Sequence, residues 1–170
     1  WKGEWNEGRL NTSVALYRTD KDNNNQRVNA KPHPYWEPLD QSSRGLDAEI
    51  SGSLTDRWQV YAGYTFNRST NRNSVGDNVE SRRKGYNFSS HTPKHMFRLY
   101  TSYILPVDDG KWTVGLGLKS SSKTANSYGS IKQGGYTIWN TNVQYRPSKN
   151  LQLGLAVNNL TDKRYYENQY

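Results

Sequence analysis

The chain has 170 residues, of which 32% are hydrophobic, with a mean hydropathy of −1.06, a formal net charge of +8 and no cysteine. This composition excludes a disulfide framework and a thiolate metal site, and it offers poor material for a conventional soluble core. Positive residues spread along the chain argue against a nucleic-acid-binding protein, whereas six Trp and 13 Tyr favour a membrane–water interface.

The first part of the chain predicts two strands and then a long loop. Trp1, Gly3 and Trp5 share one side of a short strand, which the residues after Trp5 turn back. A second strand is expected over about residues 9 to 19. Residues 20 to 43 are predicted to be a polar loop, because their asparagine run and their prolines exclude a central strand.

From residue 46 onward the sequence alternates with a period of two, which is typical of strands with one apolar face. Tight turns are expected near residues 56, 109 and 149, and long polar loops over about 68 to 92 and 122 to 134. The apolar positions, taken at every second residue, are Leu46 to Leu54, Trp58 to Phe66, Phe97 to Leu105, Trp112 to Leu118, Thr137 to Tyr145 and Leu151 to Val157.

Tight turns and long loops alternate along the chain, as they do in outer-membrane β-barrels. Their order predicts about eight antiparallel strands whose apolar residues face lipid. The tight turns are expected on the periplasmic side, with an aromatic girdle there formed by Trp58, Trp112 and Tyr145. Two architectures remain open. The strands could close as a small complete barrel with a polar core of Asp47, Glu49, Arg98 and Lys119, or they could form an arc of a larger barrel.

Three blocks of the sequence resemble TonB-dependent outer-membrane receptors. The run NNLTDKRYY, residues 158–166, resembles the family's N-L-x-D-K-x-Y-Y run before the last extracellular loop. Residues 43–66 resemble its S-R-G-x-E-x-E-x-x-G hairpin, with Asp47 where the family often has Glu, and TPKHMFRLYTSYILP, residues 92–106, resembles its N-x-P-K-H strand. The blocks cover well over half of the chain, and they are most similar to receptors for ferric siderophores.

The resemblance implies that residues 1–170 are the C-terminal part of a 22-stranded transmembrane barrel, without its last strand and without the N-terminal plug domain. It also implies an outer-membrane location and uptake of a ferric siderophore, driven by the TonB complex through the absent plug and its TonB box. Two other interpretations stay open: a small complete eight-stranded outer-membrane barrel with a structural or adhesive role, and a soluble β-sandwich binding protein.

Candidate ligand-binding residues lie in the predicted loops. Aromatic rings and guanidinium groups suit a flat, oxygen-rich, often anionic ferric chelate, through stacking and charge-assisted hydrogen bonds. The basic members would equally suit the phosphates of lipopolysaccharide, which is a second expected partner. The candidates are Tyr35 and Trp36, the cluster Arg82, Arg83, Lys84 and Tyr86, and Tyr128.

The sequence predicts neither an enzyme nor a metal site. His33, His91 and His95 are separated by polar loop or strand, without the carboxylate spacing of a metal centre. Asp47 and Glu49 point the same way on a strand, yet a polar lumen explains them without catalysis. No Ser-His-Asp order or nucleophile elbow is present. No cofactor is expected, because the iron of a transported siderophore is already chelated.

Overall fold

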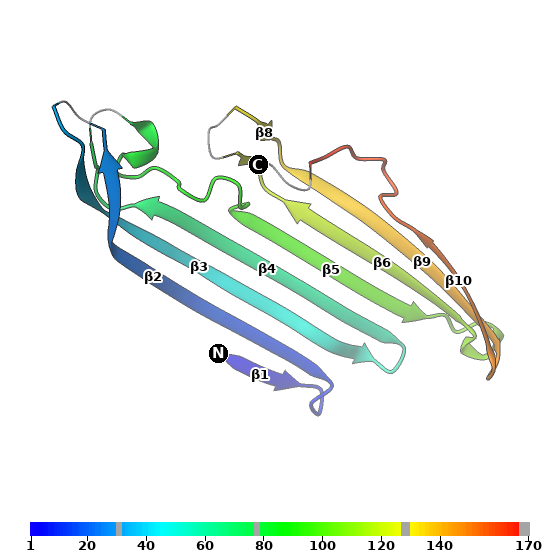
Figure 1. Ribbon diagram of the computed structural model, residues 1–170. Helices are drawn as coiled ribbons and strands as arrows, with labels where there is room; N and C mark the ends of the chain where they lie inside the picture. The colour runs from blue at the N-terminus through cyan, green and yellow to red at the C-terminus, as the bar shows by residue number, and fades with distance from the viewer. Residues whose placement is uncertain (30–31, 77–78, 127–129, 167–170) are drawn as a thin grey trace.

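The computed structural model describes residues 1–29, 32–76, 79–126 and 130–166. One antiparallel sheet passes through the whole chain in the order β1-β2-β3-β4-β5-β6-β9-β10 (Figure 1). Its strands are β1 (Lys2–Trp5), β2 (Leu10–Val28), β3 (Tyr35–Thr55), β4 (Trp58–Asn71), β5 (His95–Ile104), β6 (Trp112–Ser121), β9 (Tyr136–Ser148) and β10 (Leu151–Val157). The smaller elements are the strand pair β7 (Thr124–Ala125) and β8 (Lys132–Gln133) and the 3-10 turns η1 (Glu80–Arg82) and η2 (Asp108–Gly110). None of the described residues form a helix that is long and apolar enough to cross a membrane.

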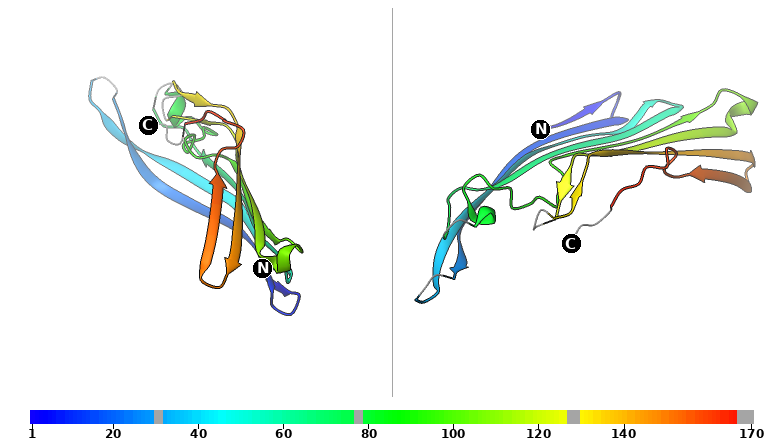
Figure 2. Two further views of the ribbon diagram at one scale, coloured as in Figure 1. Left: turned by 90° about the vertical axis from the view of Figure 1, so that its right-hand side faces the viewer. Right: turned by 90° about the horizontal axis from the view of Figure 1, so that it is seen from above.

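The sheet is a single curved layer (Figure 2). β1 and β10 lie at opposite edges and do not pair with each other, so the eight strands form an open arc and not a small closed barrel. The only other sheet among the described residues is the β7–β8 pair, which gives no second layer of a β-sandwich. The predicted number of main strands, their antiparallel order and the arc are therefore confirmed.

The backbone register fixes which side chains share a face, because successive residues of a strand point to opposite sides. One row across the sheet is mostly apolar, and the row one residue along is mostly polar or charged. From β2 to β9 the first row reads Thr12, Ile50, Ala62, Leu99, Leu118 and Trp139. The second reads Ser13, Glu49, Gly63, Arg98, Lys119 and Ile138.

No part of the chain that the structure describes covers the apolar face. Leu16 and Leu155 on this face are 79% and 68% exposed. Buried hydrophobic side chains among the described residues are only Val28, Leu39, Val75 and Ile138. A polar chain with a continuous apolar face and so small a core is suited to hydrocarbon on that face and water on the other.

Aromatic residues gather near the tight turns, as expected for a girdle. Trp112 stacks on Tyr145 with ring centroids 4.3 Å apart, and Trp58 meets Tyr103 edge to face at 6.4 Å. The nearby turn of Asp108 and its neighbours adopts positive φ values, and Lys111 Nζ donates to Asp108 Oδ1 over 2.9 Å. This hydrogen bond is the largest cause of the lowered pKa of Asp108.

The prediction of a loop over residues 20–43 was wrong. β2 continues to Val28 and β3 begins at Tyr35, so strand pairing occupies most of that segment. The register shifts once, between Lys21 and Asn24. Pro38 is tolerated because β3 pairs with β4 only as far as Gln41, so Pro38 needs no donor on that side.

The assigned facing predicts different effects for two neighbouring substitutions in β6. Leu116→Arg places a charge toward lipid and should destabilise the assembled protein by about 2–4 kcal/mol near mid-membrane. Gly117→Arg points to the other face, where a β-carbon would meet only Asn140 at an ordinary 3.5 Å, and should cost little. The effect of each variant is measured as its level at the cell surface and as the heat resistance of its folded band on a gel. Equal damage from the two variants would contradict the facing.

Candidate functional site

The loop between β4 and β5, residues 72–94, packs against the far end of the β2–β3 hairpin. Val75 in this loop joins Val28 and Leu39 in the small buried cluster, where each is at most 4% exposed. The backbone N–H of Gly76 donates to Glu37 Oε2 over 2.8 Å. Hydrophobic burial and a charge-assisted hydrogen bond therefore hold the loop to the hairpin.

Asn71, the last residue of β4, organises the loop. Its side chain is 2% exposed, and its Nδ2 donates to the carbonyls of Ser81 (2.9 Å) and Arg83 (3.3 Å). Its Oδ1 accepts from Gln41 Nε2 at 3.2 Å. Its backbone N–H donates to the Tyr86 carbonyl, and its carbonyl accepts from Gly85. One buried amide thus fixes both the start and the end of the segment that carries the basic cluster.

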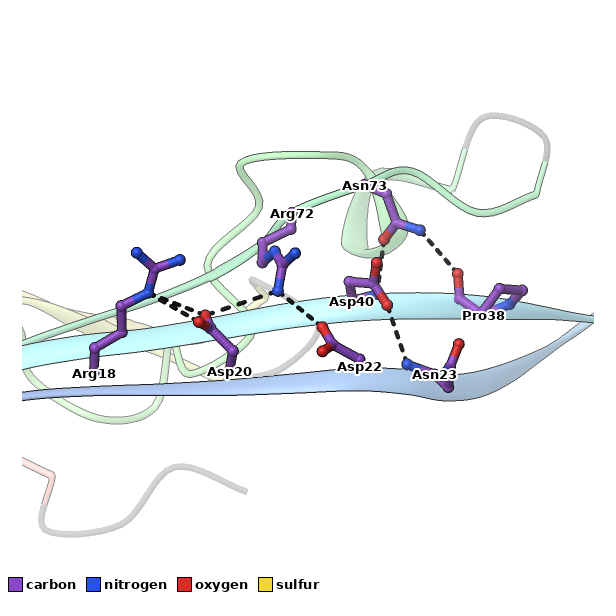
Figure 3. A network of polar contacts seen from close by, with 8 residues as sticks. All are labelled: Arg18, Asp20, Asp22, Asn23, Pro38, Asp40, Arg72 and Asn73. Carbon is purple, nitrogen blue, oxygen red and sulfur yellow. Dashed lines mark hydrogen bonds and ion pairs between the residues drawn. The ribbon is translucent and has the colours of Figure 1, made fainter.

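In addition to the contacts of Val75 and Gly76, a network of charged and amide side chains links the loop to the hairpin (Figure 3). Arg72 Nη1 lies 2.8 Å from Asp22 Oδ1 and 3.9 Å from Asp20 Oδ1. The Asn73 side chain accepts from the Asp40 backbone N–H and donates to the Pro38 carbonyl. β2, β3 and the loop therefore form one hydrogen-bonded unit.

Asp20 is the carboxylate most affected by this network. The pKa of Asp20 is lowered, first by a hydrogen bond from Ser42 and then by the guanidinium groups of Arg18 and Arg72. A lowered pKa means that the charged form is favoured in the fold, so its contribution is present at neutral pH and is lost as the pH falls through that pKa. Asp20 is therefore ionised at neutral pH.

The loops over the β6–β9 end form a second unit. Asn126, 4% exposed, donates to Ser130 Oγ and accepts from the Ile131 N–H, while its backbone carbonyl accepts from Ser90 Oγ. Tyr165, beyond β10, stacks on Tyr136 with ring centroids 4.6 Å apart. These contacts join the ends of three successive loops.

The structure gathers most of the predicted ligand residues into the first unit. Tyr35 and Trp36 lie on the hairpin and are 44% and 66% exposed. Arg82 is half-buried in η1 and lies near the point where the loop meets the hairpin, since a β-carbon on Gly76 would lie 3.7 Å from Arg82 Nη1 and 3.2 Å from Val28 Cγ1. Arg83 and Lys84 are exposed and Tyr86 is half-buried. Tyr128 lies outside the described residues.

The polar face of the strands carries charge without a catalytic arrangement. Asp47, Glu49 and Arg98 line a recess of about 270 Å³ on that face. His95 Nδ1 lies 2.8 Å from the Tyr64 hydroxyl, on the opposite, apolar face. No group of three or more His, Asp or Glu side chains placed to hold a metal occurs in the described part of the chain.

Sequence reasoning missed the residues that position the loop, namely Asn71, Arg72 and Asn73. They stand in a polar run that carries no periodic signal. Only one hint was available: consecutive Asn and Arg at the end of an alternating strand can hydrogen-bond to the chain that follows.

A single layer of antiparallel strands, apolar outside and charged inside, with tight turns at one end and docked loops at the other, is a segment of an outer-membrane β-barrel wall. The family described as TonB dependent receptor-like, beta-barrel matches residues 1–160. The chain therefore belongs to the TonB-dependent receptors, a family of the outer membrane whose members are receptors and transporters, not enzymes. The expected family and location are confirmed.

Relatives and solved structures agree with this assignment. The chain is 32% identical to the ferric-pyoverdine receptor PbuA of Pseudomonas sp. strain M114, over 97% of the chain and 20% of that protein. It is 28% identical to the catecholate siderophore receptor Fiu of Escherichia coli K12, over 92% of the chain and 20% of that protein. The ferripyoverdine receptor of Pseudomonas aeruginosa, solved with ferripyoverdine bound, superposes with a TM-score of 0.78 at 30% identity, over 97% of the chain and 23% of the receptor. The chain thus spans about a fifth of the length of these curated relatives.

The role given to Asn71 leads to a prediction. Asn71→Ala leaves two loop carbonyls without their buried donor, and each such loss costs about 1–3 kcal/mol. In the complete receptor, amide hydrogen exchange at Val75, Arg83 and Gly85 should accelerate roughly ten-fold or more. Asn25→Ala is the matched control, because Asn25 is exposed on the same hairpin and should leave exchange unchanged. Unaltered protection in Asn71→Ala would show that the loop holds without this amide.

Proposed function

We propose that this chain forms part of the barrel wall of a receptor that imports a ferric siderophore, and that the docked β4–β5 loop and the β2–β3 hairpin capture the chelate. The observation that carries the proposal is the placement of Arg82 and Arg83 in a loop held against the hairpin that bears Tyr35 and Trp36. The names of the relatives, receptors for ferric pyoverdine and for catecholate siderophores, support this class of ligand.

The chemistry of the docked unit fits a preformed iron complex. Iron arrives with its coordination sphere filled by the siderophore, so the receptor needs to supply no metal ligand. Tyr35 and Trp36 are successive residues of β3 and therefore lie on opposite faces of it, and each exposes a flat ring for stacking. Arg82 and Arg83 offer guanidinium groups, which bind oxyanions in a bidentate way. Because the loop is already fixed, binding costs less conformational entropy, and this favours recognition.

The other parts of uptake belong to the rest of the receptor. In this proposal a plug domain completes the binding site from within the barrel, facing polar residues such as Glu49, Arg98 and Lys119. The TonB complex acts on that plug from the periplasm. The wall contributes the loops and the polar lumen surface, while its apolar face contacts outer-membrane lipid. The runner-up, a small complete barrel, is disfavoured by the open sheet.

The proposal predicts the effect of removing two loop charges. Arg82→Ala combined with Arg83→Ala, in the complete receptor, should weaken binding of the recognised ferric siderophore by about 1–3 kcal/mol while the barrel still assembles. Added salt should weaken the parent more than the double variant, because screening acts on the charges that the variant lacks. Binding is measured by titration with ferric pyoverdine and with a ferric catecholate, the two ligand classes named for relatives.

The matched control removes two charges from the tight-turn end, through Arg57→Ala combined with Lys149→Ala. It should bind like the parent. If an assembled Arg82 and Arg83 variant keeps full affinity, these residues do not contact the chelate, and Tyr35, Trp36 or Tyr128 become the candidates to test. If the parent binds neither chelate, the assignment of ligand class is wrong.

A further inference from the structure

Three arginines form a row across β2, β3 and β4. Arg18 pairs with Arg44, and Arg44 pairs with Arg68, in the backbone register. The row two residues nearer the tight turns consists of Leu16, Leu46 and Phe66. Because residues two apart in a strand share a face, the arginines lie on the apolar, lipid-facing side, about 7 Å beyond its last hydrophobic row.

The depth of this row is that of the headgroups. In β4 the outward apolar side chains run from Trp58 to Phe66, about the nine to eleven residues with which a tilted strand crosses hydrocarbon. Arg68 is the next outward residue on the side of the long loops. The row therefore stands where the outer leaflet's acyl chains end and its polar groups begin.

The charges of the row are only partly neutralised by the protein. Asp20 pairs with Arg18 at 3.0 Å. Arg44 and Arg68 are exposed and form no ion pair within the described residues. Like charges directly opposite one another on neighbouring strands, which lie about 4.8 Å apart, are destabilising. An external anion would offset this repulsion.

The row opens into a recess that could receive such an anion. Arg18, Arg44, Arg68, Arg72 and Lys84 line it, with the hydroxyl-bearing Ser42 and Thr70, around a volume of about 420 Å³. Several guanidinium groups that converge on one space suit a phosphate, whose oxygens accept bidentate, charge-assisted hydrogen bonds. The apolar row immediately below suits acyl chains attached to the same molecule.

We propose that this recess binds the phosphate groups of the lipid A part of lipopolysaccharide in the outer leaflet, with Leu16, Leu46 and Phe66 against its acyl chains. Both requirements, phosphate at the headgroup level and hydrocarbon directly beneath, are met by a phosphorylated lipid. The site lies on the outward face, so it does not depend on which chelate the receptor imports.

The test uses the complete receptor in an uncharged detergent, titrated with diphosphorylated lipid A. Arg44→Gln combined with Arg68→Gln should weaken binding about ten-fold or more, because both unpaired guanidinium groups are lost. The matched control is Arg98→Gln combined with Lys119→Gln. It removes the same charge from a pair of opposed residues on the other face, and it should bind lipid A within about two-fold of the parent.

Two further measurements need no variant. Lipid A from which the phosphates have been removed should bind the parent about ten-fold or more weakly. Inorganic phosphate in large excess should not displace lipid A, because it lacks the acyl chains. The proposal is overturned if dephosphorylated lipid A binds equally well, if the outward and inward variants behave alike, or if inorganic phosphate displaces the lipid, which would make the recess a site for free phosphate.

Discussion

The backbone hydrogen-bond ladder from β1 to β10 determines which way each side chain of the sheet faces. Hydrocarbon offers no water to satisfy an unpaired amide, so strands in a membrane must pair along their length. Once they do, one step along β6 exchanges Leu118 in the apolar row for Lys119 in the charged row. With so few buried hydrophobic side chains, the ladder and the surrounding lipid take the place of a conventional core.

The same ladder explains how far the fold could be predicted. Where one face meets lipid, apolar residues recur at every second position, and the expected strands from Trp58 to Phe66 and from Leu151 to Val157 appear in the structure. Beyond Leu16, toward the long loops, both faces meet polar surroundings. The alternation of apolar and polar residues is therefore lost there, although the pairing of β2 with β3 continues to Val28. There, side-chain amides pair across the strands, as Asn24 does with Gln41.

The candidate site was only partly readable from sequence. Arg82 and Trp36 could be chosen because their chemistry suits an oxygen-rich anion wherever they stand. Asn71 could not, because its role arises from the fold: its amide meets the Ser81 and Arg83 carbonyls only when the loop turns back over the end of β4. Residue type predicts what a side chain can bind, whereas tertiary contacts determine which residue holds it in place.

Alternation also divides the basic residues of this chain between two surfaces. Arg44 and Arg68 belong to the outward face alone, and Arg82 lies in the docked loop. Arg72 belongs to both, because its guanidinium lines the outward recess and pairs with Asp20 and Asp22 to hold the loop to the hairpin. Substitution of Arg72 would therefore disturb both surfaces together, whereas residues confined to one face can separate lipid contacts from chelate contacts. The two positively charged surfaces therefore meet at Arg72 and at Lys84, a member of the basic loop cluster that also lines the recess.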